Sequence, residues 1–171
     1  MTTDFSSFRP SRLWRQLPLE RRKEAAHLFW ADEQSSEQQV EAVGAIATRM
    51  KFRPRSVVAL PVDRKTKYLA GLPNVSDTIA ARALVTWHLE RQRPMMAAFL
   101  DGVGIPHENG LISEETVPKP DVDKLKAAAA DLAAKYPAED VALYLSTLVS
   151  QDPDTWGALA DVPEVAGPQA P

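Results

Sequence analysis

The 171-residue sequence predicts an all-α protein, either a compact helical bundle or a short solenoid, with no β-sheet. Two observations lead to this prediction. Apolar residues recur at the three- and four-residue spacing that places them on one side of a helix, in one segment after another. Arg-Pro pairs at Pro10, Pro54 and Pro94 recur at intervals of 44 and 40 residues, and a proline favours a helix boundary.

These intervals indicate about three repeated helical units of 40–44 residues, covering residues 9–52, 53–92 and 93–160. Residues 17–21 (Leu-Pro-Leu-Glu-Arg) match residues 60–64 (Leu-Pro-Val-Asp-Arg). HEAT and armadillo repeats have similar periods, although their specific signatures are absent here. Stacking would let each unit cover the apolar face of the next. The alternative is that such prolines are common helix boundaries and coincide by chance.

The first unit is expected to open with a short helix at Pro10, followed by a helix over 19–33. Apolar residues of this second helix fall on one face, namely Leu19, Ala25, Ala26, Phe29 and Trp30. Ser36 and Gln39 have the spacing of a capping box, which predicts that a third helix begins there.

That third helix carries a regular apolar stripe, which we expect to be buried: Val40, Val43, Ile46, Ala47 and Met50. Gly44 flanks the stripe, although glycine costs a helix about 1 kcal/mol relative to alanine. We expect the missing side chain to let a neighbouring backbone approach closely.

The second unit repeats this order. A short helix follows Pro54, a longer helix begins near Pro61, and Ser76 caps a helix over 77–91. Apolar residues lie around most of the circumference of this last helix, which is typical of a buried helix.

The third unit is expected to hold a short helix over 95–103, a long loop over 102–120 and helices over 121–136, from Pro137 and from Pro153. Residues 9–160 are assigned to a single helical domain. Residues 1–8 and 161–171 are expected to be disordered.

Composition excludes several classes of protein. The chain has no cysteine, which rules out disulfides, thiolate metal sites and cysteine nucleophiles. It has no signal-peptide pattern and no apolar run of the roughly 20 residues that a membrane span needs. We therefore expect a soluble cytoplasmic protein that does not act at a membrane.

Charge is distributed unevenly along the chain. Residues 1–104 hold 16 Lys and Arg against 11 Asp and Glu, whereas residues 105–171 hold 4 against 12. A basic first part and an acidic second part can pair within one molecule, pair between molecules, or leave the basic part for an acidic partner.

Three histidines are candidates for chemistry. Glu24 and His27 have the spacing of a di-iron motif, but no second copy exists and His27 lies off the apolar face. His88 lies on the apolar helix and is expected to bond a backbone carbonyl or a carboxylate. In the long loop, His107, Glu108 and Asn109 form the most site-like cluster, although Glu-Asn-Gly is also ordinary turn chemistry.

The remaining candidates are basic. The residues Arg9, Arg12, Arg15, Arg21, Arg22 and Lys23 are followed one unit later by Arg53, Arg55, Arg64, Lys65 and Lys67. Stacked units would align these side chains into a ridge able to bind a phosphate backbone. Alternatively, the Arg before each proline neutralises the C-terminal end of a helix dipole.

Taken together, the sequence favours a non-enzymatic protein-interaction or scaffolding module that self-associates through its basic and acidic halves, with no cofactor, metal or catalytic residue assigned. The alternatives are nucleic-acid binding by the basic N-terminal ridge, and a small helical enzyme or ligand-binding protein with a site near the loop at 102–120.

Overall fold

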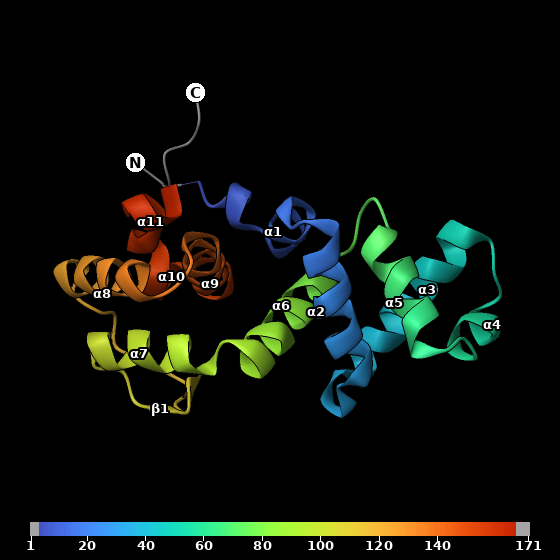
Figure 1. Ribbon diagram of the computed structural model, residues 1–171, viewed down its shortest axis with the longest axis horizontal. Helices are drawn as coiled ribbons and strands as arrows, with labels where there is room; N and C mark the ends of the chain where they lie inside the picture. Colours follow the sequence, from blue (N-terminus) through green and yellow to red (C-terminus); the bar gives the residue numbers. More distant parts are fainter. Residues whose placement is uncertain (1–3, 167–171) are drawn as a thin grey trace. The chain divides into compact units, whose positions relative to one another are not determined.

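The computed structural model describes residues 4–166, which are mostly helical, as the sequence predicts (Figure 1). These residues divide into two compact units. The N-terminal unit comprises residues 10–90, and the C-terminal unit combines the described residues before Pro10 with those from Arg91 onward.

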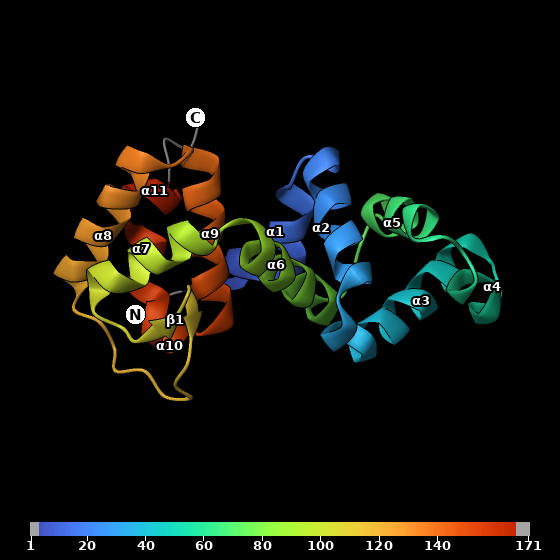
Figure 2. The ribbon, with the colours of Figure 1, turned by 60° about the horizontal axis from the view of Figure 1, so that its bottom comes forward.

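The helices of the N-terminal unit follow the predicted order. They are α1 (Pro10–Gln16), α2 (Leu19–Ala31), the 3₁₀ turn η2 (Glu33–Ser35), α3 (Ser36–Met50), α4 (Pro54–Val58), α5 (Val62–Gly71) and α6 (Asp77–Arg91). Within this unit, α2 packs along α5, and α3, α4 and α5 form a group beyond α2 (Figures 1 and 2).

Two prolines precede helices with nearly the same backbone angles. Pro18 precedes α2 with φ −58° and ψ 150°, and Pro61 precedes α5 with φ −58° and ψ 153°. Their carbonyl oxygens accept hydrogen bonds from the Arg22 and Lys65 N–H groups, at 3.0 and 3.1 Å. The Leu-Pro pairs therefore mark the helix starts that the sequence indicated.

The start of α3 differs from the prediction. Ser35, not Ser36, is the residue before the helix, and no capping box forms. Three residues predicted to be buried on apolar faces are instead exposed: Leu19, Val40 and Met50. Val40 is the most exposed of the three, at 73%.

Helix α6 is buried on most of its circumference, which agrees with the prediction for residues 77–91. The Ser76 hydroxyl caps it by accepting from the Ile79 N–H at 3.2 Å. His88 is buried, and its Nδ1 lies 2.8 Å from the Leu84 carbonyl oxygen. The structural role expected for His88 is confirmed.

The C-terminal unit is built from short and medium helices with a small hairpin. Its elements are η1 (Ser6–Phe8), α7 (Arg93–Val103), β1 (His107–Glu108), β2 (Leu111–Ile112), α8 (Val122–Lys135), α9 (Ala138–Gln151), α10 (Pro153–Trp156), η3 (Gly157–Asp161) and α11 (Pro163–Ala166). In its core, the centre of the Phe99 ring lies 5.7 Å from the ring centre of Tyr144 and 6.0 Å from that of Trp156. Burial raises the pKa of Tyr144.

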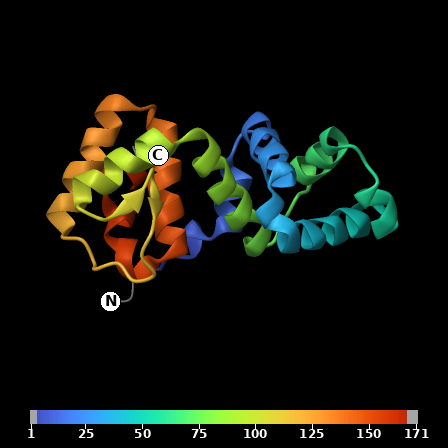
Figure 3. The same ribbon diagram turned by 90° about the horizontal axis from the view of Figure 1, so that it is seen from below.

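The hairpin corrects the expectation of a fold without a sheet. His107 pairs with Ile112 and Glu108 with Leu111 in an antiparallel register (Figure 3). Asn109 and Gly110 form the two-residue turn with φ 49° and 88°. Positive φ at both positions gives the turn the twist that antiparallel strands need.

Two glycines in helices differ from expectation. Apart from the backbone of α3 itself and the residues next in sequence, no heavy atom of residues 4–166 lies within 4 Å of a Cβ added at Gly44. The close approach expected there occurs at Gly102 instead, where an added Cβ would lie 3.2 Å from the Ala128 Cβ. Packing against α8 therefore explains Gly102 of α7 but not Gly44 of α3.

Other boundaries were less regular than predicted. Residues 93–160 contain the hairpin and do not follow the short-medium-long helix order, so a third copy of the unit is not confirmed. Of the ends expected to be disordered, residues 1–3 and 167–171 lie outside the described residues, whereas η1 and α11 occupy parts of the remainder.

Alanine should have opposite effects on stability at two glycines, Gly110 in the hairpin turn and Gly71 on α5. A Cβ on Gly110 would lie 2.9 Å from the Met96 Cβ, and its φ of 88° disfavours alanine. We expect Gly110→Ala to lower the free energy of unfolding by more than about 1 kcal/mol. Gly71→Ala, in open space on α5, should raise it by about 0.4–1 kcal/mol. Urea denaturation of both variants tests this; equal effects would contradict the turn geometry.

Candidate functional site

An apolar groove of about 560 Å³ lies in the N-terminal unit, on the surface formed by α2, α3, α4 and α5. Its lining residues are Trp30, Ser36, Gln39, Val40, Val43, Gly44, Pro54, Val58 and Lys65. We refer to these nine residues as the groove.

Helix α3 supplies one wall. Ser36, Val40 and Val43 are spaced at helical intervals and share a face. Gly44 continues this face and leaves a gap in it, because its position holds no side chain and no neighbour fills the space. Val40 is 73% exposed, whereas Val43 is 9% exposed and lies deeper.

Helix α4 supplies the opposite side. Arg53 is extended, with φ −75° and ψ 142°, as a residue before proline prefers, and Pro54 then opens the helix. Val57 faces inward and is fully buried, while Val58 points the other way and is 60% exposed. The groove thus lies between two exposed valines on different helices.

The rest of the lining comes from Trp30 on α2 and Lys65 on α5. The Lys65 ammonium lies 5.1 Å from the centre of the Trp30 ring, within the range of a cation–π interaction. Trp30 also packs edge-to-face on Phe29, with ring centres 5.2 Å apart. Its buried indole N–H has no acceptor among residues 4–166, so packing holds the ring in place.

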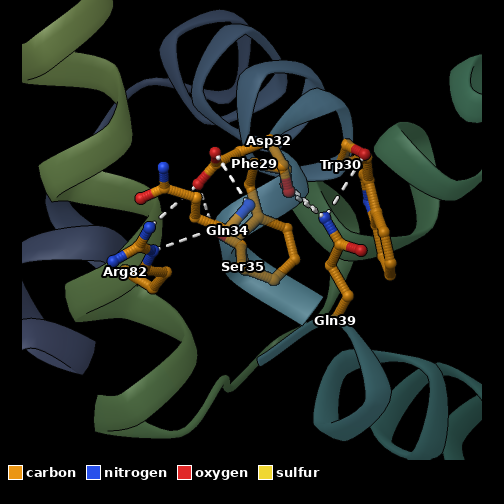
Figure 4. A network of polar contacts seen from close by, with 7 residues as sticks. All are labelled: Phe29, Trp30, Asp32, Gln34, Ser35, Gln39 and Arg82. Carbon is orange, nitrogen blue, oxygen red and sulfur yellow. Dashed lines mark hydrogen bonds and ion pairs between the residues drawn. The ribbon is translucent and has the colours of Figure 1, made fainter. Parts of the chain in front are cut away.

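The corner between α2 and α3 is fixed by a network centred on Asp32 (Figure 4). Asp32 accepts from the Gln34 N–H at 3.2 Å, from the Ser35 hydroxyl and from the Arg82 guanidinium at 3.0 Å. Arg82, from α6, also donates to the Ser35 hydroxyl at 2.8 Å. One carboxylate thereby joins the α2–α3 corner to α6.

The network changes the ionisation of Asp32. Burial alone would raise the pKa of its carboxyl group. The hydrogen bonds from Ser35, Arg82 and Gln34, together with the charge of Arg82, outweigh burial and hold the pKa below the ordinary value of 3.8.

Gln39 ties the two groove helices together on the other side of the corner (Figure 4). Its Nε2 lies 2.9 Å from the Phe29 carbonyl oxygen, 3.4 Å from that of Trp30 and 2.8 Å from that of Asp32. Phe29 and Trp30 lie in the last turn of α2, where carbonyls lack i+4 partners within the helix, and Asp32 is the C-cap residue. The residue expected to cap its own helix therefore caps the preceding one.

Of the eleven basic candidates, the five from the second predicted unit lie on α4 and α5 or beside them. Lys65 lines the groove. Arg53 and Arg55 are exposed on either side of Pro54, and Lys67 is exposed on α5. Arg64 instead lies against Tyr68, with its guanidinium 6.0 Å from the ring centre.

The His107 cluster belongs to the hairpin of the C-terminal unit. The His107 Nε2 lies 2.7 Å from an Asp101 carboxylate oxygen, and its Nδ1 accepts from the Gly110 N–H at 3.0 Å. The Asn109 carbonyl oxygen accepts from Arg93 at 2.9 Å, and Glu108 is exposed. These contacts hold the turn, so the structure favours the turn interpretation of this cluster.

The exposed apolar residues of the groove were not predicted from the sequence. The apolar stripe of α3 predicts that Val40 is buried. No pattern in the sequence marks Val58. The available signal was Gly44, since a glycine within an apolar stripe either admits a neighbour or leaves a gap.

Within residues 4–166, no three or more His, Asp or Glu side chains gather in a way that would hold a metal ion. In the same residues, no helix combines the length and the apolar character that crossing a bilayer requires. Comparisons of the chain with protein-family models, with curated proteins and with solved structures find no match.

The Asp32 network predicts a pH-dependent loss of stability. At pH 7, Asp32→Asn should lower the free energy of unfolding by about 1–3 kcal/mol, because it weakens hydrogen bonds to a charged acceptor. The folded-state pKa is depressed, so this contribution is complete above the unfolded pKa of about 3.9 and disappears as pH falls through the folded value. Wild type and variant should therefore converge in acid.

Glu33→Gln provides the matched control, because Glu33 is exposed and next in sequence. It removes the same charge and should change the free energy of unfolding by less than about 0.5 kcal/mol. Urea denaturation between pH 7 and pH 2 measures all three proteins. Equal losses for both variants would mean that the network does not stabilise the corner.

Proposed function

We propose that the N-terminal unit is a protein-interaction module that binds a helical peptide segment in the groove. The observation that supports this most directly is the pair of valines, Val40 and Val58, which are 73% and 60% exposed at the groove. An amphipathic helix laid into an apolar groove buries such side chains, which is a common mode of peptide recognition.

The chemistry of the lining favours binding over catalysis. Among the described residues, the polar side chains of the groove are Ser36, Gln39 and Lys65. Gln39 is already bonded to carbonyl oxygens of α2, and Lys65 lies over Trp30. No acid–base pair or activated nucleophile is assembled there from residues 4–166.

The exposure of the walls favours a peptide over a small molecule. Sites for small ligands enclose most of the ligand surface, whereas both valines here are open to solvent. Burying one valine side chain fully contributes about 1.5–3 kcal/mol. Two such contacts contribute about 3–6 kcal/mol, which is comparable with the lower end of the cost of association. Apolar contacts with the rest of the lining must therefore contribute as well, and we expect a weak and reversible interaction.

Gly44 gives independent support. Glycine within a helix costs about 1 kcal/mol relative to alanine, and no close neighbour in the described residues requires it. The cost is understandable if the missing side chain keeps the groove open for an apolar side chain of the partner.

We also propose that residues 10–50 and 54–91 arose by duplication. Both hold a short, a medium and a long helix in the same order, and Pro18 and Pro61 have nearly identical backbone angles. In this interpretation, Lys65 is the counterpart of Arg22, since each donates its N–H to the proline carbonyl at the helix start.

Selection from a displayed library of random 16-residue peptides tests the proposed function. We expect wild-type protein to enrich peptides with apolar residues at three- and four-residue spacing. Val40→Lys should weaken their binding by at least about tenfold, which corresponds to the roughly 1.4 kcal/mol expected from losing a buried apolar contact.

Two further variants complete the test. Gly44→Leu should fill the groove and abolish binding while leaving the protein folded, because leucine favours a helix and the space is open. Val122→Lys, at a valine of α8 that is 42% exposed, should leave binding unchanged. Failure to enrich peptides, or binding indifferent to Val40→Lys and Gly44→Leu, would refute the proposal.

A further inference from the structure

We infer that the segment bound in the groove is an acidic amphipathic helix of a different protein. This inference rests on the proposed function and adds the charge of the partner. It follows from the ionisable residues on the elements that surround the groove, taken one side at a time.

The α4 side is strongly basic. Three exposed basic residues occupy alternate positions of the chain next to Pro54, namely Lys51, Arg53 and Arg55. Their side chains make no hydrogen bond or ion pair with any residue between 4 and 166. Lys65 adds a fourth positive charge within the groove itself.

The acidic residues near the groove lie at the α2–α3 corner, on α3 and on α5, not on the α4 side. Asp32 is paired with Arg82, and Glu41 accepts from the Ser76 hydroxyl. On α5, the Asp63 carboxylate lies 4.0 Å from His27. Glu37, at the start of α3, is exposed and follows Ser36, a groove residue. No carboxylate among residues 4–166 forms an ion pair with Lys51, Arg53 or Arg55, so the positive charge beside α4 is unpaired, which favours carboxylates on the partner.

A second copy of this chain does not supply such a helix. The C-terminal unit is acidic, but it exposes few large apolar side chains. Among the described residues of this unit, they are Leu111 in the hairpin and Val122 on α8. Neither provides an apolar ridge at helical spacing. Two N-terminal units meeting groove to groove would bring the same basic residues together, which is unfavourable.

Nucleic acid is the other acidic partner to consider. Basic residues alone would suit a phosphate backbone, but binding of single strands also uses exposed aromatic rings on which bases stack. In the groove the aromatic residue is Trp30, which is 8% exposed and lies beneath Lys65. Beside the basic residues, Phe52 is 37% exposed, and its ring packs edge-to-face on Tyr68 with ring centres 5.8 Å apart. The aliphatic lining favours a peptide.

The probe is a designed helical peptide of about 16 residues with leucines at three- and four-residue spacing and glutamates at the flanking positions. A matched peptide carries lysine in place of every glutamate. Fluorescence anisotropy with the full chain should give a dissociation constant at least about tenfold lower for the acidic peptide at low salt. The difference should shrink as salt rises, because exposed charges are screened.

Charge reversal on the protein identifies the residues responsible. The double variant Arg53→Glu, Arg55→Glu should reverse the preference between the two peptides. Lys124→Glu with Lys126→Glu, at exposed positions of α8 in the C-terminal unit, makes the same charge change and should have no effect. Gly44→Leu should abolish binding of both peptides.

Three outcomes would overturn the inference in distinguishable ways. Equal binding of both peptides, lost in Gly44→Leu, would retain the groove as a binding site but refute its charge preference. No binding of either peptide would count against the proposed function as well. Binding of a 30-nucleotide DNA at low salt that is lost in Arg53→Glu, Arg55→Glu but kept in Gly44→Leu would identify the basic residues as a nucleic-acid site.

Discussion

The corner between α2 and α3 is the constraint on which the groove depends. Asp32 bonds to the turn that follows α2 and to Arg82 of α6, while Gln39 reaches back from α3 to the last carbonyls of α2. With the angle between the two helices fixed on both sides, α3 cannot rotate to bury its whole apolar stripe. Its inner part packs in the core, and Val40 stays at the surface.

The C-terminal unit shows a different use of similar residues. His107, Asp101 and Gly110 are joined by hydrogen bonds that order a tight hairpin, and Gly102 allows α7 and α8 to approach closely. Here the polar cluster and the glycine stabilise local structure. In α3, by contrast, no contact with another element of residues 4–166 explains Gly44. The groove is therefore the stronger candidate for a binding surface.

Much of the fold followed from the sequence because its signals are local. Prolines, the Ser76 cap and helical periodicity located α2, α3, α5, α6, α8 and α9 closely. The exposed valines could not be predicted, since periodicity shows which residues share a face but not how far a neighbour covers it. The hairpin was missed although Asn109-Gly110 is a strong turn signal, because its strands have only two residues each. Lys65 was identified from charge alone, without its position beside Trp30.

The central claim is that the groove is open to solvent in the protein by itself. Paramagnetic relaxation of valine methyl groups by a soluble gadolinium chelate measures this directly. Val57 and Val58 are adjacent on α4 but are 0% and 60% exposed, so they form an internal comparison. We expect Val40 and Val58 to relax at least as fast as Val122, and Val57 to be protected. Protection of Val40 and Val58 to the level of Val57 would contradict the account.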